Sequence, residues 1–162
     1  MRVTNTIPQD DLRKVPAAVR AVEAAGYDGL FALENRHNPF LPLAIAAVNS
    51  TRIELATGIA IAFARSPMTV ANIGWDLQGA SGGRFVIGLG SQVKGHNERR
   101  FSVPWSPPAP RMREYVLALG RLGGHLNHKC DGLPGWQTLW RGAMKLHAMM
   151  EYELSRRRSG KL

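Results

Sequence analysis

A glutamate and a histidine three residues apart are the first residues in this sequence whose types could do chemistry. Glu34 and His37 lie in a polar segment, residues 34–38, that directly follows the apolar run at residues 29–33. Histidine changes its charge near neutral pH, so His37 could transfer a proton to or from a bound molecule. Glu34 could orient that histidine or close a structural hydrogen bond at the strand end. His37 could equally be an ordinary histidine of a surface loop.

A second polar segment follows the apolar run at residues 85–90 and is rich in basic side chains. Its polar and basic members are Ser91, Gln92, Lys94, His96, Arg99 and Arg100. Lysine and arginine side chains there could hold a phosphate or another acidic group. A solvated basic loop is the commoner explanation for a run of this kind.

Two histidines and a cysteine, His125, His128 and Cys130, are close enough in sequence to raise the question of a metal site. Zinc normally takes four ligands, and no second pair of suitable ligands is evident, so we expect no metal. Cys130 is the single cysteine of the chain and cannot form an internal disulfide. This agrees with a reducing, cytoplasmic environment.

These residues need elements to position them, and residues 1–119 alternate strand-like and helix-like patterns four times. The expected strands are residues 2–7, 29–33, 53–61 and 85–90. The expected helices are a first one capped by Asp10 or Asp11 and ending at residue 25, then residues 42–49, 67–81 and 111–119. Ser66-Pro67 is a typical helix start, with serine as N-cap and proline in the first turn. Residues 91–110 are expected to form a long loop.

Alternating strands and helices predict an α/β fold with a parallel sheet, either an open doubly wound sheet or a barrel. The first strand-to-helix turn lacks Gly-x-Gly-x-x-Gly, which counts against a dinucleotide-binding open sheet. Polar residues instead follow the second, third and fourth strands, where a (β/α)8 barrel carries its chemistry. A complete barrel needs about 250 residues. We therefore expect a partial (β/α)8 TIM barrel of about four β/α units.

The alternating pattern stops after Leu119, and we divide the chain into residues 1–119 and residues 120–162 there. The second segment has a glycine-rich stretch at residues 120–135, an expected helix at residues 136–154 and a basic end. The abrupt change suggests a frameshift or truncation near Leu119, and a native, divergent end is the alternative. Half a barrel would leave strand edges unpaired.

Composition and charge exclude some functions without selecting one. The longest apolar runs, residues 41–48 and 55–64, are far shorter than the roughly 20 residues that span a bilayer. The net charge is +9, with 13 Lys/Arg and 9 Asp/Glu in residues 1–119 and 8 Lys/Arg and 3 Asp/Glu in residues 120–162. No stacking aromatics alternate with the basic end, so we expect neither nucleic-acid nor membrane binding.

Three segments resemble the luciferase-like monooxygenase family, which includes deazaflavin-dependent reductases. The first is residues 24–31 (AAGYDGLF), with Glu34 and His37 beyond it. The second is residues 51–60 (TRIELATGIA) followed by residues 65–68 (RSPM), and the third is residues 81–91 (SGGRFVIGLGS). Their order and spacing carry the resemblance, which runs from Met1 to about Leu119 and is strongest to the deazaflavin-dependent branch.

The resemblance implies a barrel that holds a flavin-type ring, coenzyme F420 or FMN, in its mouth and acts on a small organic substrate. In such enzymes the reduced ring either activates oxygen or passes a hydride. It further implies catalytic roles for His37 and Glu34, and a non-proline cis peptide in the region of Gly58-Ile59. The implied cofactor-binding residues are Gly58, Ile59, Ala60, Gly90, Ser91, Gln92, Lys94 and Arg99. Gly58 could also be present only to relieve crowding inside the barrel.

Two functions remain open from the sequence. The first is a luciferase-like flavin/F420-dependent oxidoreductase, of monooxygenase or hydride-transfer type, that is truncated and inactive alone. The second is a non-catalytic half barrel completed by a partner chain or by self-association, for example as a homodimer. The sequence selects neither the substrate nor one of the two cofactors.

Overall fold

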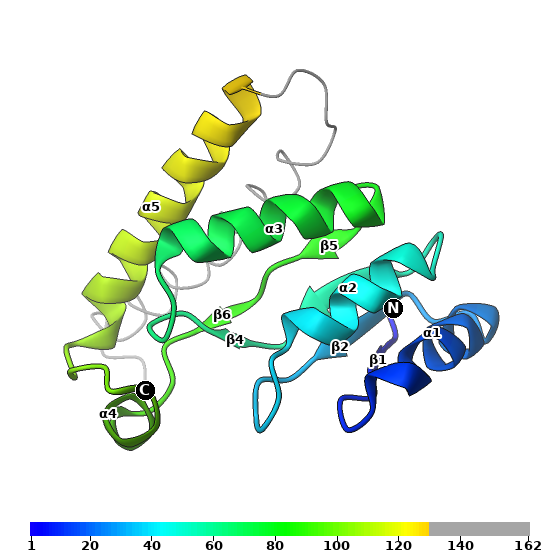
Figure 1. Cartoon of the computed structure of the whole chain (residues 1–162), viewed down its shortest axis with the longest axis horizontal. Coiled ribbons are helices and arrows are strands. Elements are labelled where there is room, and N and C mark those ends of the chain that lie inside the picture. The colour runs from blue at the N-terminus through cyan, green and yellow to red at the C-terminus, as the bar shows by residue number, and fades with distance from the viewer. Residues whose placement is uncertain (130–162) are drawn as a thin grey trace.

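A parallel β-sheet covered by helices forms the centre of the computed structural model, which describes residues 1–129 (Figure 1). Four strands pair side by side in chain order, namely β1 (Thr4–Thr6), β2 (Gly29–Ala32), β3 (Glu54–Thr57) and β5 (Phe85–Val86). Strand β4 (Ala60–Ile61) follows β3, strand β6 (Leu89–Gly90) follows β5, and the two pair with each other in parallel. The chain order is kept without the reversal of a doubly wound sheet, so this is the first part of a β/α barrel.

The helices cover the sheet in the same order as the strands. They are a short 3-10 helix, η1 (Leu12–Lys14), and α1 (Val15–Ala24), α2 (Phe40–Val48), α3 (Pro67–Ser81), α4 (Lys94–Phe101) and α5 (Pro108–Lys129). Helix α1 packs against α2, α2 against α3, and α3 against α5, as Figure 1 shows. Between helices and sheet lies an apolar core whose fully buried side chains include Leu30, Leu43, Leu55, Val70 and Phe85.

The third and fourth strands were each expected to be continuous, and both are interrupted. The first interruption falls at Gly58-Ile59, whose peptide bond is cis, as the family resemblance implied. Ala56 lies opposite Val86 and Ala60 lies opposite Leu89, so three residues of one strand face two of the other. This is the geometry of a β-bulge, which re-aims the end of a strand. An unbroken apolar run reports burial and does not reveal such a break.

Helix boundaries also differ from the sequence prediction, for local reasons. Helix α2 begins at Phe40 rather than at residue 42, and the side-chain oxygen of Asn38 accepts a hydrogen bond from the Phe40 N–H at 2.9 Å just before it. The expected loop at residues 91–110 contains α4, since its four prolines all lie after that helix, at residues 104–110. Helix α5 begins at Pro108, earlier than expected, and continues past Leu119 to Lys129.

The predicted start of α3 is confirmed in detail. Ser66 is the N-cap and its hydroxyl accepts a hydrogen bond from the Thr69 N–H at 3.1 Å, with Pro67 in the first turn. Gly82 ends the helix with a φ of 61°, a left-handed conformation that glycine adopts without strain. Helix α3 therefore leaves the end of β4 in a defined direction.

Part of the sequence prediction concerns the chain beyond Lys129. Cys130, the expected helix at residues 136–154 and the basic end lie outside the described residues. Within residues 1–129, no helix combines the length and the apolar character needed to cross a lipid bilayer.

Candidate functional site

The residues singled out from the sequence follow the carboxyl ends of neighbouring parallel strands. Glu34 and His37 follow β2, residues 58–59 join β3 to β4, and Ser91 follows Gly90, the last residue of β6. Since β2, β3 and β5 are parallel and adjacent, these positions share one edge of the sheet. This edge is where a barrel gathers its chemistry, and it is the candidate active site.

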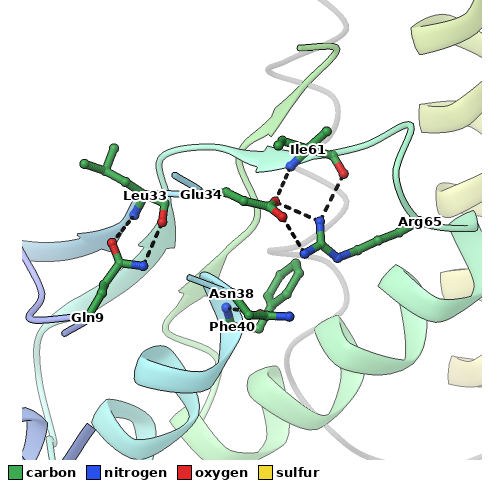
Figure 2. Close-up of polar contacts among 7 residues, drawn as sticks. All are labelled: Gln9, Leu33, Glu34, Asn38, Phe40, Ile61 and Arg65. Carbon is green, nitrogen blue, oxygen red and sulfur yellow. Dashed lines mark hydrogen bonds and ion pairs between the residues drawn. The ribbon is translucent and has the colours of Figure 1, made fainter. Parts of the chain in front are cut away.

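A buried ion pair between Glu34 and Arg65 occupies the middle of this edge (Figure 2). One guanidinium nitrogen of Arg65 donates to Glu34 Oε1 at 2.7 Å and the other donates to Glu34 Oε2 at 2.8 Å. The Arg65 side chain is only 15% exposed and the Glu34 side chain only 5%. Such a two-point contact is the strong, geometrically specific form of an arginine–carboxylate pair.

The same pair also reaches the backbone of Ile61 in β4. The Ile61 N–H donates to Glu34 Oε2 at 2.7 Å, and the Ile61 carbonyl accepts from Arg65 at 3.1 Å. Figure 2 shows that these bonds link Glu34, Arg65 and Ile61 into a closed ring. Of the two roles expected for Glu34, the structure contains the hydrogen bond at the strand end. Arg65 was noted in the sequence only as part of a motif, because its partner lies 31 residues away.

His37 is exposed, in the loop between β2 and α2. In the part of the chain that the structure describes, no hydrogen bond or ion pair joins it to Glu34, whose oxygens face Arg65 and Ile61. His37 is therefore open to solvent at the candidate edge. Its proton-transfer role stays a prediction.

A threonine that sequence reasoning missed joins the two interrupted strands. Thr57, which is 3% exposed, donates its hydroxyl proton to the Gly88 carbonyl at 2.7 Å and accepts from the Gly88 N–H at 2.8 Å. A side chain at Gly88 would run into the carbonyl oxygen of Thr57. The threonine hydroxyl thus replaces ladder bonds that the bulge interrupts.

The predicted ring-binding residues of β3 and β4 differ in what they expose. A side chain at Gly58 would come within 2.7 Å of the Phe31 ring, which supports the alternative that glycine relieves crowding there. Ala60 is buried, at 1% exposed. Ile59 is 39% exposed. Its side chain lies against Gly90, where an added Cβ would come within 2.7 Å of the Ile59 terminal carbon. Ile59 is therefore the apolar group that this segment presents at the edge.

The residues after β6 form a short connection, residues 91–93, that leads into α4. Ser91 and Gln92 are half-buried, and the Ser91 carbonyl accepts a hydrogen bond from the Asn97 side chain at 2.9 Å. Lys94 lies in α4, 4.0 Å from Glu98 and 5.4 Å from the centre of the Trp105 ring. Arg99 is exposed on the same helix. The structure places these cations beside the strand ends, and their binding of a cofactor stays a prediction.

A second group that the sequence did not reveal surrounds Phe63, just beyond β4. The Arg111 guanidinium lies 4.4 Å from the centre of the Phe63 ring, and Tyr115 meets the same ring edge-on at 6.5 Å. The Tyr115 hydroxyl is buried and has no hydrogen-bond partner within the described residues 1–129. Burial raises the pKa of Tyr115 to about 12, against a smaller opposing effect of the Arg65 charge, so the phenol stays protonated at neutral pH.

Metal ligands do not cluster in the described residues. Within residues 1–129, no three His, Cys, Asp or Glu side chains come together as a metal ion would require. Of the suggested group His125, His128 and Cys130, the cysteine lies outside that range.

Known proteins that are similar in sequence and in fold point to one family. The sequence signature of the luciferase-like monooxygenases matches residues 1–132. A Mycobacterium tuberculosis protein of uncharacterized role is 53% identical over 119 residues, covering 74% of this chain and 35% of its own length. The 5,10-methylenetetrahydromethanopterin reductase of Archaeoglobus fulgidus is 31% identical over 116 residues, which is 70% of this chain and 35% of the reductase.

Solved structures agree on the fold. A monooxygenase from Streptomyces bottropensis superimposes with a TM-score of 0.66 at 19% identity, over 75% of this chain and 42% of that one. The coenzyme F420-dependent tetrahydromethanopterin reductase from Methanopyrus kandleri gives a TM-score of 0.62 at 23% identity, over 75% and 40%. The chain belongs to the luciferase-like monooxygenase family, which contains flavin- and F420-dependent oxidoreductases. It spans about a third of the length of the curated relatives named above.

Proposed function

We propose that this chain provides the first half of a flavin- or F420-dependent oxidoreductase site, with the cofactor ring resting on the strand edge around Ile59. The observation that carries the proposal is the paired interruption of two adjacent strands, which leaves the Ile59 side chain 39% exposed just after β3. An exposed apolar side chain at the strand ends suits the face of a planar ring. The residues present therefore fit one face of such a group.

The chain's own residues would divide the remaining tasks. Bound here, the reduced cofactor would supply a hydride or activate oxygen for a small organic substrate. His37, exposed on the loop after β2, would hold or move a proton at the same edge. Lys94 and Arg99 would attract an acidic part of the cofactor. We favour F420 over FMN, because a Mycobacterium tuberculosis protein that is 32% identical over 99 residues is described as a putative coenzyme F420-dependent oxidoreductase.

A titration followed by cofactor fluorescence tests this proposal. The chain is titrated with F420 and, separately, with FMN, and we expect weak binding that saturates only at high cofactor concentration, since half of a barrel's ring contacts are absent from it. His37→Ala should leave that binding within about twofold, because the residue is proposed to act on protons. Tight, stoichiometric binding would contradict the half-site proposal, and no binding of either cofactor would contradict the oxidoreductase function.

The open sheet edges favour one alternative, a half barrel completed by a second copy or a partner chain. Among the described residues, β1 pairs only with β2 and β5 pairs only with β3, so each leaves one side without a strand partner. Unpaired strand edges are templates for association. Sedimentation at low concentration separates the two functions: a discrete symmetric dimer supports self-completion, and a monomer or a heterogeneous aggregate does not.

A further inference from the structure

Among the described residues, the short strand β4 has no neighbouring strand on the side that faces β2. Its ladder consists of two register pairs with β6, Ala60 with Leu89 and Ile61 with Gly90. Its backbone bonds toward β6 come from Ala60 and Ala62, which donate to the carbonyls of Gly88 and Gly90. In a strand the backbone groups alternate in direction, so those of Ile61 face the opposite side, beyond the end of β2.

The Glu34–Arg65 pair supplies the missing partners on that side. Glu34 accepts from the Ile61 N–H and Arg65 donates to the Ile61 carbonyl, so one side-chain pair serves both backbone groups of this residue. A buried backbone group without a partner costs about 1–3 kcal/mol. Glu34 and Arg65 thus make the two backbone hydrogen bonds that β2 would make if it were long enough to reach Ile61.

Arg65 also joins three separate segments of the chain. Its guanidinium bonds the loop after β2 through Glu34, bonds β4 through Ile61, and stacks 5.3 Å from the centre of the Phe40 ring at the start of α2. Figure 2 shows these groups gathered around the guanidinium. Lysine offers one point charge and no planar fork, so it cannot reproduce this set of contacts.

We propose that Arg65 is a positioning residue that, through Glu34, holds β4 and with it the exposed Ile59 in place for the cofactor ring. The inference rests on the proposed function for its last step, since Ile59 lies two residues before Ile61. Glu34 on this account contributes by placing the strand end rather than by accepting a proton from substrate. On this account Arg65 acts through Glu34 and Ile61.

The test compares Arg65→Met and Arg65→Lys with a matched control at the other end of the strands. Glu23→Gln is that control, because the Glu23 carboxylate also accepts backbone N–H bonds, from Thr51, Arg52 and Ile53. Two quantities are measured for each variant: amide hydrogen exchange resolved at single residues, and the dissociation constants for F420 and FMN. Urea unfolding corrects both for any loss of global stability.

We expect Arg65→Met to speed exchange of the Ile61 amide at least about tenfold beyond the global change and to weaken cofactor binding about tenfold. Arg65→Lys should give a smaller effect in the same direction. Glu23→Gln should speed exchange at residues 51–53 and leave Ile61 and cofactor binding as in the unaltered chain. Unchanged Ile61 exchange in both Arg65 variants overturns the inference, as does unchanged cofactor binding once Ile61 exchange has risen.

The two proposals fail in different ways. If the unaltered chain binds neither cofactor, the proposed function is contradicted, while the exchange rates still decide whether Arg65 holds β4. If the Arg65 variants unfold globally before Ile61 can be followed, Glu34→Gln replaces them. That substitution keeps the size of the side chain and removes the charge that orders the guanidinium, and Ile61 exchange no faster than in the unaltered chain overturns the inference.

Discussion

The hydroxyl of Thr57 bonds both backbone groups of Gly88, donating to its carbonyl at 2.7 Å and accepting from its N–H at 2.8 Å. The two residues sit where their strands are interrupted, and the pair carries the sheet across the bulge. The buried side chain of Thr57 thus connects the paired strands β3 and β5, before the interruption, with the candidate site that follows it.

Thr57→Val should destabilise the chain by about 2 kcal/mol, because it keeps the shape of the side chain and leaves the Gly88 N–H without its partner. Thr57→Ser keeps the hydroxyl and should cost about 1 kcal/mol or less for the lost methyl group. Urea unfolding followed by tryptophan fluorescence measures both. Equal losses in the two variants would show that packing of the methyl group, and not the hydroxyl, stabilises this position.

Alanine at Gly88 and at Gly90 should differ sharply in cost. A side chain at Gly88 meets the backbone oxygen of Thr57, which cannot move without shifting a strand, so we expect a loss of about 3 kcal/mol or failure to fold. At Gly90 the nearest atom is the end of the Ile59 side chain, which can rotate, so the loss should be about 1 kcal/mol. Thermal unfolding of the two variants in parallel gives the order, and the reverse order would contradict this description of the bulge.

Tyr115→Phe should make the chain less sensitive to alkaline pH. The pKa of Tyr115 is raised to about 12 in the folded chain against 10.0 for an ordinary tyrosine, because the phenol is buried. The folded state therefore holds this proton more tightly, and the associated stability is complete below pH 10 and is lost as pH rises from about 10 to about 12. Phenylalanine has no such proton, so the variant should gain about 1 kcal/mol relative to the unaltered chain at pH 11.

The same substitution at neutral pH tests whether the Tyr115 hydroxyl has a partner. The buried hydroxyl has no hydrogen-bond partner in the part of the chain that the structure describes, so its removal should leave stability at pH 7 unchanged or slightly higher. Urea unfolding at pH 7 and at pH 11 gives both comparisons. A loss of more than about 1 kcal/mol at pH 7 would mean that the hydroxyl is hydrogen-bonded in solution.

Ser66→Ala should cost about 1 kcal/mol by removing the N-cap of α3, since the Thr69 N–H then has no side-chain acceptor. Ser66→Asp is the control, because aspartate caps a helix as well as serine does. Circular dichroism during thermal unfolding follows both variants. A melting temperature lowered equally by the two substitutions would point to a role of Ser66 other than capping.

Much of the architecture followed from the sequence because its signals are local. The apolar run at residues 29–33 and the Ser66-Pro67 start each depend on neighbours a few residues away, and the structure contains the strand and the helix they predict. The order of strand and helix patterns also placed Glu34 and Gly90 at strand ends, because each strand must end before the helix that follows it. The cis peptide at Gly58-Ile59 came from the family resemblance and not from any local pattern.

The chain's sequence by itself determined the α/β order, the barrel rather than the open sheet, the family, and the edge at which polar residues gather. Only the tertiary structure decided that two strands are interrupted and that residues 94–101 are helical. It also decided that Glu34 forms an ion pair with Arg65 and not with His37. The physical reason is distance along the chain. Glu34 and Arg65, like Thr57 and Gly88, are 31 residues apart, and they meet only because parallel strands bring their carboxyl ends to one edge.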